Sequence, residues 1–253
     1  MLRTRVIPCL LLKNESLVKT VKFKEYNYIG DPVNTVRIFN ELEVDELMFL
    51  DIFASKEGSS INFKILKDIA NECFMPLSYG GNIKSLDDAK KIFKIGFEKV
   101  VINSNAFDNL KLIEEISKYF GAQSIVGSID IKQSFFGGQK VYSHHGKKKQ
   151  SIGIVEWAIQ LEKAGVGELL ITSVDKEGSW DGYDVELIKS ITHSVQVPVI
   201  ANGGCGAVEH IGEVVKKANA SACAVGSMVV YQKKGAGVLV SFPGKKALEE
   251  VLR

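Results

Sequence analysis

The chain has 253 residues, with 32 Lys and Arg against 30 Asp and Glu, so its formal charge is only +2. This balance argues against nucleic acid or a membrane surface as its main partner, and no run of about 18 apolar residues or signal peptide occurs, so we expect a cytoplasmic protein. The four cysteines, Cys9, Cys73, Cys205 and Cys223, are far apart and form no C-x-x-C pair. We therefore expect no disulfide scaffold, no metal site and no cofactor.

Short apolar runs alternate with segments of helical period along the chain, a pattern typical of βα units and a parallel sheet. Eight runs are predicted to be strands, at 6–12, 46–50, 76–79, 99–102, 124–129, 168–172, 198–201 and 222–225. Amphipathic helices are predicted at 33–41, 60–70, 85–93, 110–119, 154–164, 184–192 and 208–218. Eight such units without a Pro-rich or Ser-rich linker favour one α/β domain over 1–253, a closed (β/α)8 (TIM) barrel. A doubly wound open sheet is the alternative, because the same alternation produces both.

Two pairs of similar stretches indicate an internal repeat. The stretch VDELMFLDIFAS at 44–55 resembles VGELLITSVDKEG at 166–178, and each is followed by a Pro-strand-Gly segment, PLSYGGNI at 76–83 and PVIANGGCG at 198–206. Chance similarity is possible for either pair alone and improbable for both at nearly the same offset. The sequence therefore predicts two half-barrels, of about 1–120 and 121–253.

Two long segments follow predicted strands, where the loops of a barrel build its active site. The segment 13–32 is polar and aromatic, as an active-site lid or a decorating hairpin would be. The segment 132–151 contains Phe135, His144, His145 and lysines at 147–149. We interpret it as a solvated hairpin whose lysines face water, with no ligand role for its histidines.

Glycines after the last two predicted strands indicate a phosphate site. Gly203 and Gly204 follow the seventh strand, and Gly226 and Ser227 follow the eighth. These strands most often bind phosphate in a barrel, where backbone N–H groups, a hydroxyl and the N-terminus of a short helix hold the anion without a lysine.

The repeat predicts a second, matching site in the first half. Gly80 and Gly81 would face Asn103 and Ser104, so that the two sites together grip both ends of a bisphosphate. The copies differ at Asn82, which stands where the second half has Gly204. Its side chain is expected to crowd the first-half site.

Several long stretches resemble the HisF family, the cyclase subunits of imidazole glycerol phosphate synthase, up to about residue 231. The matching segments are RVIPCL, ELMFLDIFAS, GFEKVVINS, GAQSIVGSIDIK, GELLITSVDKEG, DGYD and PVIANGG. The resemblance implies a heterodimer with a HisH-like glutaminase, docked on the bottom of the barrel. Ammonia then travels through the barrel and reacts with a phosphorylated substrate at the top, closing an imidazole ring and releasing an aminoimidazole carboxamide nucleotide (AICAR) in histidine biosynthesis.

The same resemblance implies a charged gate for ammonia at the bottom of the barrel. Its residues fall on Arg5, Glu46, Lys99 and Glu168, and all four residue types of the family are present. Each precedes or opens an apolar strand, where a charge is costly unless it is paired. Two positive and two negative groups can neutralise one another in a ring.

The catalytic carboxylates of the family are only half present. The resemblance assigns a general acid–base role to Asp130, at the end of the fifth strand. The other position is Leu11, and the Asp-Gly that usually follows the next lysine, Lys13 here, is replaced by Asn14 and Glu15. Because a leucine transfers no proton, ordinary ring closure should lose about 10²–10⁴-fold. The segment 233–244 also differs from the usual family ending.

Three functions remain open. The first is a divergent HisF-like synthase subunit, of the type found with sugar amidotransferases, that delivers ammonia for surface-polysaccharide sugars. The second is the ordinary cyclase, with Glu15 or water in place of the missing carboxylate. The third is a non-catalytic activating subunit that keeps a phosphate pocket only for regulation.

Overall fold

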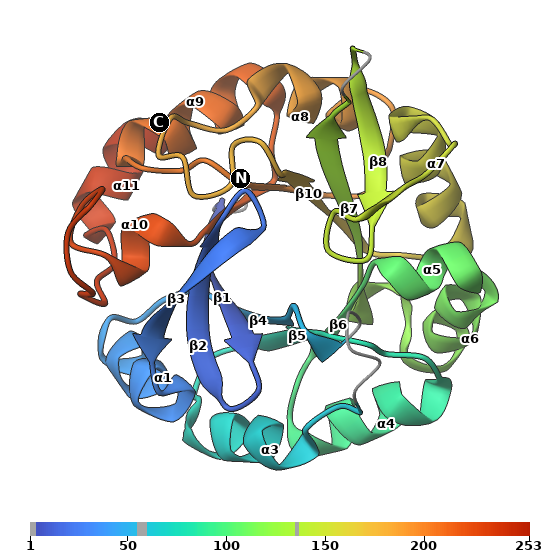
Figure 1. Cartoon of the computed structure of the whole chain (residues 1–253), viewed down its shortest axis with the longest axis horizontal. Helices are drawn as coiled ribbons and strands as arrows, with labels where there is room; N and C mark the ends of the chain where they lie inside the picture. The colour runs from blue at the N-terminus through green and yellow to red at the C-terminus, as the bar shows by residue number, and fades with distance from the viewer. Residues whose placement is uncertain (1–3, 55–59, 135–136) are drawn as a thin grey trace.

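Eight parallel strands follow one another around a closed circle with helices on the outside (Figure 1). The computed structural model describes residues 4–54, 60–134 and 137–253. The barrel strands are β1 (Arg5–Lys13), β4 (Leu47–Asp51), β5 (Leu77–Gly80), β6 (Lys99–Ile102), β7 (Ile125–Gln133), β10 (Glu168–Ser173), β11 (Val199–Asn202) and β12 (Ala222–Val225). Because β1 pairs in parallel with both β4 and β12, the sheet closes on itself. The predicted (β/α)8 barrel is confirmed, and the doubly wound alternative is wrong.

The outer helices agree with the predicted amphipathic segments to within three residues at each end. They are α1 (Pro32–Glu41), α3 (Phe63–Glu72), α4 (Leu86–Ile95), α6 (Lys111–Phe120), α7 (Ile154–Ala164), α8 (Val185–Thr192) and α9 (Val208–Ala218). Side chains fix several starts: Ser85 and Asp88 form a capping box at α4, and Asp184 accepts the Leu187 N–H at α8.

Within the described residues, four further helical segments lie outside the predicted amphipathic helices, and one of them is the short helix expected after the eighth strand. They are α5 (Ser104–Asp108), η1 (Ala122–Ser124), α10 (Ser227–Val230) and α11 (Lys245–Leu252). The first three span little more than one turn, which is too short for a helical period to appear in the sequence. The fourth directly follows the segment 233–244 and packs on α9.

Apolar residues fill two concentric layers because the barrel strands are buried on both faces. Along β1, Val6, Leu10 and Leu12 pack outward against the helices, and Ile7 and Cys9 pack inside the barrel. The interior layer is made by Ile7, Cys9, Met48, Val101, Val126, Leu170, Ile200, Ala222 and Ala224. The barrel interior is therefore filled by apolar side chains, and a cavity lies toward the carboxyl ends of the strands.

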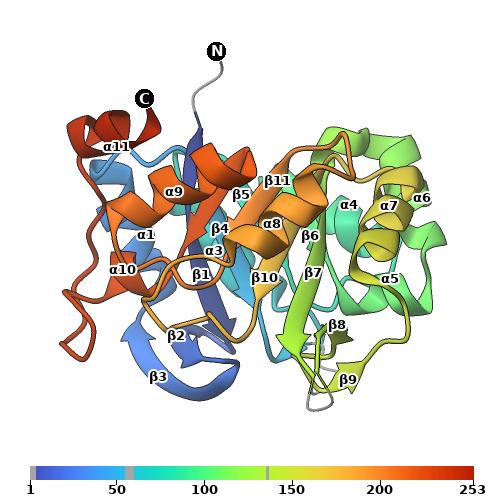
Figure 2. The same ribbon diagram turned by 90° about the horizontal axis from the view of Figure 1, so that it is seen from above.

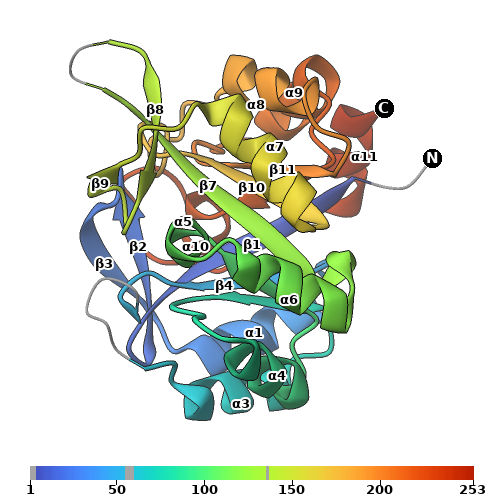
Figure 3. The same cartoon turned by 90° about the vertical axis from the view of Figure 1, so that its right-hand side faces the viewer.

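Two antiparallel hairpins project beyond those carboxyl ends, on the side opposite to the N-terminus (Figures 2 and 3). The first consists of β2 (Ser16–Val21) and β3 (Lys24–Gly30), and the second of β8 (Gln139–Ser143), paired with β7 and with β9 (Lys148–Lys149). Both predicted loop segments are thus hairpins, and the lysines at 147–149 are exposed as expected. Phe135 lies outside the described residues.

The repeated stretches of the sequence form β4 and β10, which stand four strands apart in the closed order. This placement is what two half-barrels require, and the division into halves stays a prediction. Within the described ranges, no helix is long and apolar enough to cross a membrane. The same residues contain no cluster of His, Cys, Asp and Glu that could hold a metal ion.

Candidate active site

A cavity opens at the carboxyl ends of the barrel strands, beneath the two hairpins. Every barrel strand or the segment directly after it contributes to its wall. The cavity collects all the residues predicted for the top of the barrel: Asp130, Gly81, Asn103, Ser104, Gly203, Gly204, Gly226 and Ser227. The structure therefore places these residues around one space, and their individual roles stay predictions.

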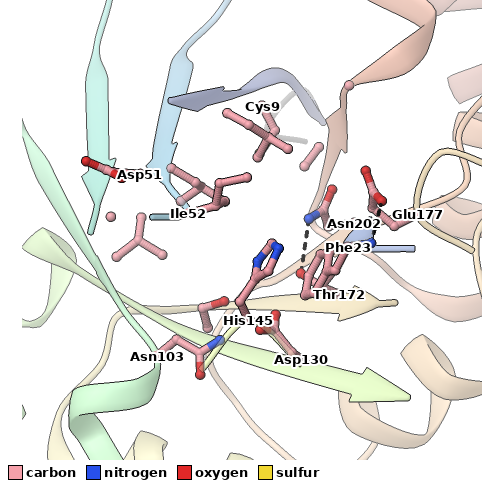
Figure 4. Close-up of a pocket in the computed structure, with 18 of the residues that line it drawn as sticks. Cys9, Phe23, Asp51, Ile52, Asn103, Asp130, His145, Thr172, Glu177 and Asn202 are labelled. Carbon is pink, nitrogen blue, oxygen red and sulfur yellow. Dashed lines mark hydrogen bonds between the residues drawn. The ribbon is translucent and has the colours of Figure 1, made fainter. Parts of the chain in front are cut away.

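Asp130 lies near the end of β7 with its side chain at the cavity (Figure 4). The residue is only 8% exposed, and burial raises its pKa from 3.8 to about 7, although a hydrogen bond from Asn103 acts in the opposite direction. A carboxyl group that titrates near neutral pH can both donate and accept a proton there. The Oδ1 atom of Asn103 is buried without a hydrogen-bond partner, so it is available to a donor on a ligand.

The wall opposite Asp130 is apolar. Leu11 lies on β1, four strands away from β7, and it pairs in register with Leu50 on β4. Cys9 and Val101 also line the cavity, and burial raises the pKa of the Cys9 thiol to about 12. None of these groups transfers a proton readily near neutral pH, so the cavity carries its acid–base chemistry on the Asp130 side.

Glu15 does not lie at the Asp130 cavity. It is exposed in the turn between β1 and β2 and lines a separate hollow with Asn14, Phe53 and Asn62. Because it is not among the residues that line the Asp130 cavity, the structure does not support the suggested replacement of the lost acid–base group by Glu15.

The second-half glycines adopt conformations that only glycine accepts without strain. Gly203 and Gly204 have φ angles of 94° and 107°, and a Cβ on Gly203 would lie 2.6 Å from the carbonyl oxygen of Ser173. Gly226 and Ser227 complete this wall, but α10 has only four residues. The dipole of so short a helix is small, so backbone N–H groups and the Ser227 hydroxyl remain as the donors for an anion.

The first-half site differs in shape as well as in sequence. Gly81 is confined because a Cβ there would lie 2.6 Å from Cβ of Asp51. Asn82 has a φ angle of 50°, a left-handed conformation that asparagine accepts more easily than most residues, and it lines the cavity. Asn103 and Ser104, after β6, lie across from it. An Asn thus replaces glycine at the expected anion loop.

Sequence reasoning missed three charged residues of the cavity, Asp51 and the pair Lys19 and Glu177. Lys19 on β2 forms a buried ion pair with Glu177, which follows β10, and Glu177 also accepts hydrogen bonds from the Thr20 hydroxyl at 3.0 Å and the Phe23 N–H at 3.2 Å. A Cβ on Gly226 would lie 2.9 Å from Cε of Lys19. A lysine therefore does stand beside the predicted phosphate loop. The lysine inside the apolar run SLVKTV was the available signal.

The four predicted gate residues form a ring at the opposite end of the barrel. Arg5 donates to Glu46 and to Glu168, both at 2.6 Å, and Lys99 contacts the same two carboxylates at 3.1 and 3.3 Å. Burial lowers the pKa of Arg5, but the attraction of Glu168 and Glu46 outweighs it and raises this pKa overall. The structure thus brings all four charges together, and their action as a gate stays a prediction.

Fold and site define a (β/α)8-barrel protein with a cavity at the carboxyl ends of its strands and a closed ring of charges at the other end. The family described as "Histidine biosynthesis protein" matches residues 5–235. A Pseudomonas aeruginosa protein provisionally named imidazole glycerol phosphate synthase subunit hisF2 is 49% identical over 249 residues, covering 98% of this chain and 99% of its own length.

Two further relatives give the same result. A Vibrio vulnificus protein provisionally named subunit hisF3 of the same synthase is 42% identical, covering 98% of each chain. The imidazole glycerol phosphate synthase subunit HisF of Methanococcus vannielii is 39% identical, covering 92% of this chain and 93% of its own length. The chain belongs to the HisF family, which confirms the resemblance seen in the sequence.

Proposed function

We propose that this chain is the synthase subunit of a glutamine amidotransferase complex. It forms a heterodimer with a HisH-like glutaminase, receives ammonia through the barrel and delivers it to a phosphorylated substrate at the Asp130 cavity. The observation that carries the proposal is the arrangement of the two charged sites on one barrel axis. The Arg5–Glu46–Lys99–Glu168 ring lies where ammonia would enter, and Asp130 with the Gly203–Gly204 loop lies where it would react.

The reacting group is expected to differ from that of an ordinary cyclase. Leu11 and Leu50 make one wall of the cavity apolar, and Asn82 alters the first-half anion loop. The second-half loop and Asp130 line the same cavity. We therefore extend the proposal to a changed acceptor, a phosphorylated sugar that is amidated for surface polysaccharide. A barrel that still delivers ammonia but acts on a different acceptor would keep the charged ring and differ in the residues around the acceptor.

The test is reconstitution with a glutaminase. We expect the purified chain to bind a HisH-like glutaminase and to increase its rate of glutamine hydrolysis, measured as glutamate released. An exposed-surface variant, Lys64→Ala on α3, serves as the control and should stimulate equally. A chain that neither binds the glutaminase nor stimulates it would rule the proposal out.

The ordinary cyclase of histidine biosynthesis is the second candidate, and the identity shared with the Methanococcus vannielii HisF subunit favours it. It predicts ring closure from the bisphosphate substrate with added ammonium salts, forming imidazole glycerol phosphate and AICAR. Turnover close to that of an ordinary HisF subunit, measured side by side, would establish this function and exclude the changed acceptor.

A non-catalytic activating subunit is the remaining alternative. It would keep the glycine-lined cavity for a regulatory phosphate and have no use for a proton-transferring Asp130. Loss of ammonia-dependent activity on replacing Asp130, with binding of the glutaminase unchanged, would exclude it.

A further inference from the structure

The turn after β8 holds its backbone in an unusual conformation. His144, His145 and Gly146 have φ angles of 52°, 58° and 70°, so two residues with a Cβ adopt the left-handed region in succession. The N–H of Lys147 closes the turn on the carbonyl oxygens of Ser143 at 3.1 Å and His144 at 3.3 Å. Backbone strain of this kind persists only where its surroundings impose it, and it concentrates at functional sites.

The turn places the His145 side chain at the cavity. Its imidazole lines the same space as Asp130 and Asn103, and Figure 4 shows these three side chains in one part of the cavity. The imidazole stacks on Phe23 of the first hairpin, with ring centroids 4.8 Å apart and planes 6° from parallel, and Phe53 lies 6.4 Å away. These contacts hold the plane of the imidazole in a defined orientation, as a group that acts on a substrate requires.

The adjacent His144 attaches the turn to the predicted first-half site. Its backbone N–H donates to the Ser104 hydroxyl at 2.9 Å, so this hydroxyl can direct its own proton elsewhere. The His144 ring lies 2.9 Å from the Ser143 hydroxyl, which also accepts a hydrogen bond from the Gln150 side chain at 2.7 Å. His144 is thus engaged within the turn, whereas His145 faces the cavity.

The other titratable groups of the cavity are poorly suited to proton transfer. Burial raises the pKa of Cys9 to about 12 and that of Cys205 to about 11. Lys19 and Glu177 are bonded to each other, and Asp51 accepts the N–H groups of Phe53 and Ala54. Among the cavity residues that the structure describes, Asp130 and His145 remain. Imidazole both accepts and donates protons near neutral pH.

We propose that His145 is a second catalytic acid–base group and contacts the same substrate as Asp130. This inference rests on the proposed ammonia transfer to a substrate in this cavity. When ammonia adds to a carbonyl carbon, a C–N bond forms and the C=O π bond breaks. The nitrogen then loses one proton, and the oxygen gains one. One of the two groups takes the nitrogen proton, and the other supplies the oxygen proton, so that no net charge is created.

Charged groups on each neighbouring element face His145 and bear on its pH dependence. Asp130 lies on the cavity side. The groups around the hollow on its outer side are Lys22, Lys24, Glu25, Lys132 and Lys147. The charge on the outer side is thus mainly positive, whereas the cavity side holds Asp51, Asp130 and the Lys19–Glu177 pair.

The kinetic test compares His145→Phe with the wild-type chain in the residual ring closure of the bisphosphate substrate with ammonium salts, the reduced activity expected of a chain with Leu11. Phenylalanine keeps a ring against Phe23 and removes proton transfer. We expect KM to stay within a few-fold and kcat to fall by about 10²-fold or more. The plot of kcat against pH should also lose the ionisation that His145 contributes. Asparagine adopts the left-handed region easily but transfers no proton, so His145→Asn separates loss of proton transfer from distortion of the turn. If proton transfer is what is lost, the kcat of His145→Asn should fall as far as that of His145→Phe. His193→Phe, on exposed His193 at the end of α8, is the matched control. A His145→Phe kcat close to wild type overturns the inference.

A second measurement needs no turnover. The sequence has four histidines, so their imidazole NMR signals can be assigned by comparing the variants. Adding the bisphosphate in ammonia-free buffer should shift the His145 signal and leave the His193 signal in place. An unmoved His145 signal at saturating bisphosphate overturns the inference. This readout is independent of glutaminase stimulation, so failure here and failure of the proposed function are distinguishable.

Discussion

Burial of Asp130 raises the pKa of its carboxyl group, and this raised pKa lowers the stability of the native state at neutral pH. The native chain holds its proton up to about pH 7, whereas an unfolded chain releases it near 3.8. Between these values the native state binds more protons, so its stability falls as the pH rises through this window, and the full penalty applies above it. A carboxyl group that titrates near neutral pH therefore lowers the free energy of unfolding at neutral pH.

We predict that Asp130→Asn is more stable than the wild type at high pH and far less active. The gain in the free energy of unfolding should approach about 4 kcal/mol at pH 8 and be much smaller at pH 5, because one pKa unit corresponds to about 1.4 kcal/mol. Urea unfolding at both pH values measures it, with exposed Asp68→Asn as the control. Turnover should fall by about 10²–10⁴-fold. Equal stability at pH 8 would contradict the raised pKa.

At the scale of elements, the β2–β3 hairpin is held across the cavity by the residue that follows β10. Glu177 binds Lys19, Thr20 and the backbone of Phe23, and its backbone oxygen accepts the Lys22 N–H at 3.0 Å. Glu177 and Lys19 are both nearly buried, so neither charge has water as an alternative partner. The hairpin is therefore held at this point by a buried ion pair together with these hydrogen bonds.

Replacing Lys19 with Met should release this hairpin. The change leaves Glu177 buried without its counter-charge, at a cost of about 3–5 kcal/mol. We expect amide hydrogen exchange over 16–30 to accelerate by about 10²–10³-fold, with the outer helices unaffected. Lys22→Met is the matched control, since Lys22 is exposed on the same hairpin. Similar exchange in the two variants would mean that the pair does not hold the hairpin.

For the whole molecule, the charged ring and the cavity occupy opposite ends of one barrel. The apolar interior layer around Met48, Val126 and Leu170 lies between them. Apolar side chains pass a neutral molecule more readily than an ion, because a charge there has no partner. This arrangement suits the transfer of ammonia rather than ammonium.

Lys99→Ala is expected to affect turnover with glutamine as the nitrogen source more than turnover with ammonium salts. It removes one cation of the ring, while Arg5 remains bonded to both Glu46 and Glu168, so the barrel should stay folded. With the glutaminase bound, glutamine-dependent turnover should change by about tenfold or more, and turnover with ammonium salts should stay within a few-fold. Equal loss of both activities would exclude a gating role.

Much of this architecture follows from local pattern. Apolar runs of four to nine residues separated by amphipathic segments identify the eight barrel strands, most of them to within one residue at each end. The largest difference is β7, predicted over 124–129 and observed to Gln133, because it continues into the hairpin with β8. The glycines after the strands and the internal repeat indicate the anion-binding residues, and the family resemblance indicates Asp130 and the ring.

By itself, the sequence determined the alternation of strands and helices and the glycine loops that follow the strands. All of these are local properties of the chain. Only the tertiary structure decided that the sheet closes, that Lys19 meets Glu177 158 positions away, and that His145 joins Asp130 at one cavity. Closure of the sheet requires β1 to pair with β12, at the other end of the chain. The two side-chain contacts require hairpins that fold over the barrel. Because both depend on residues far apart in the sequence, no local pattern predicts them.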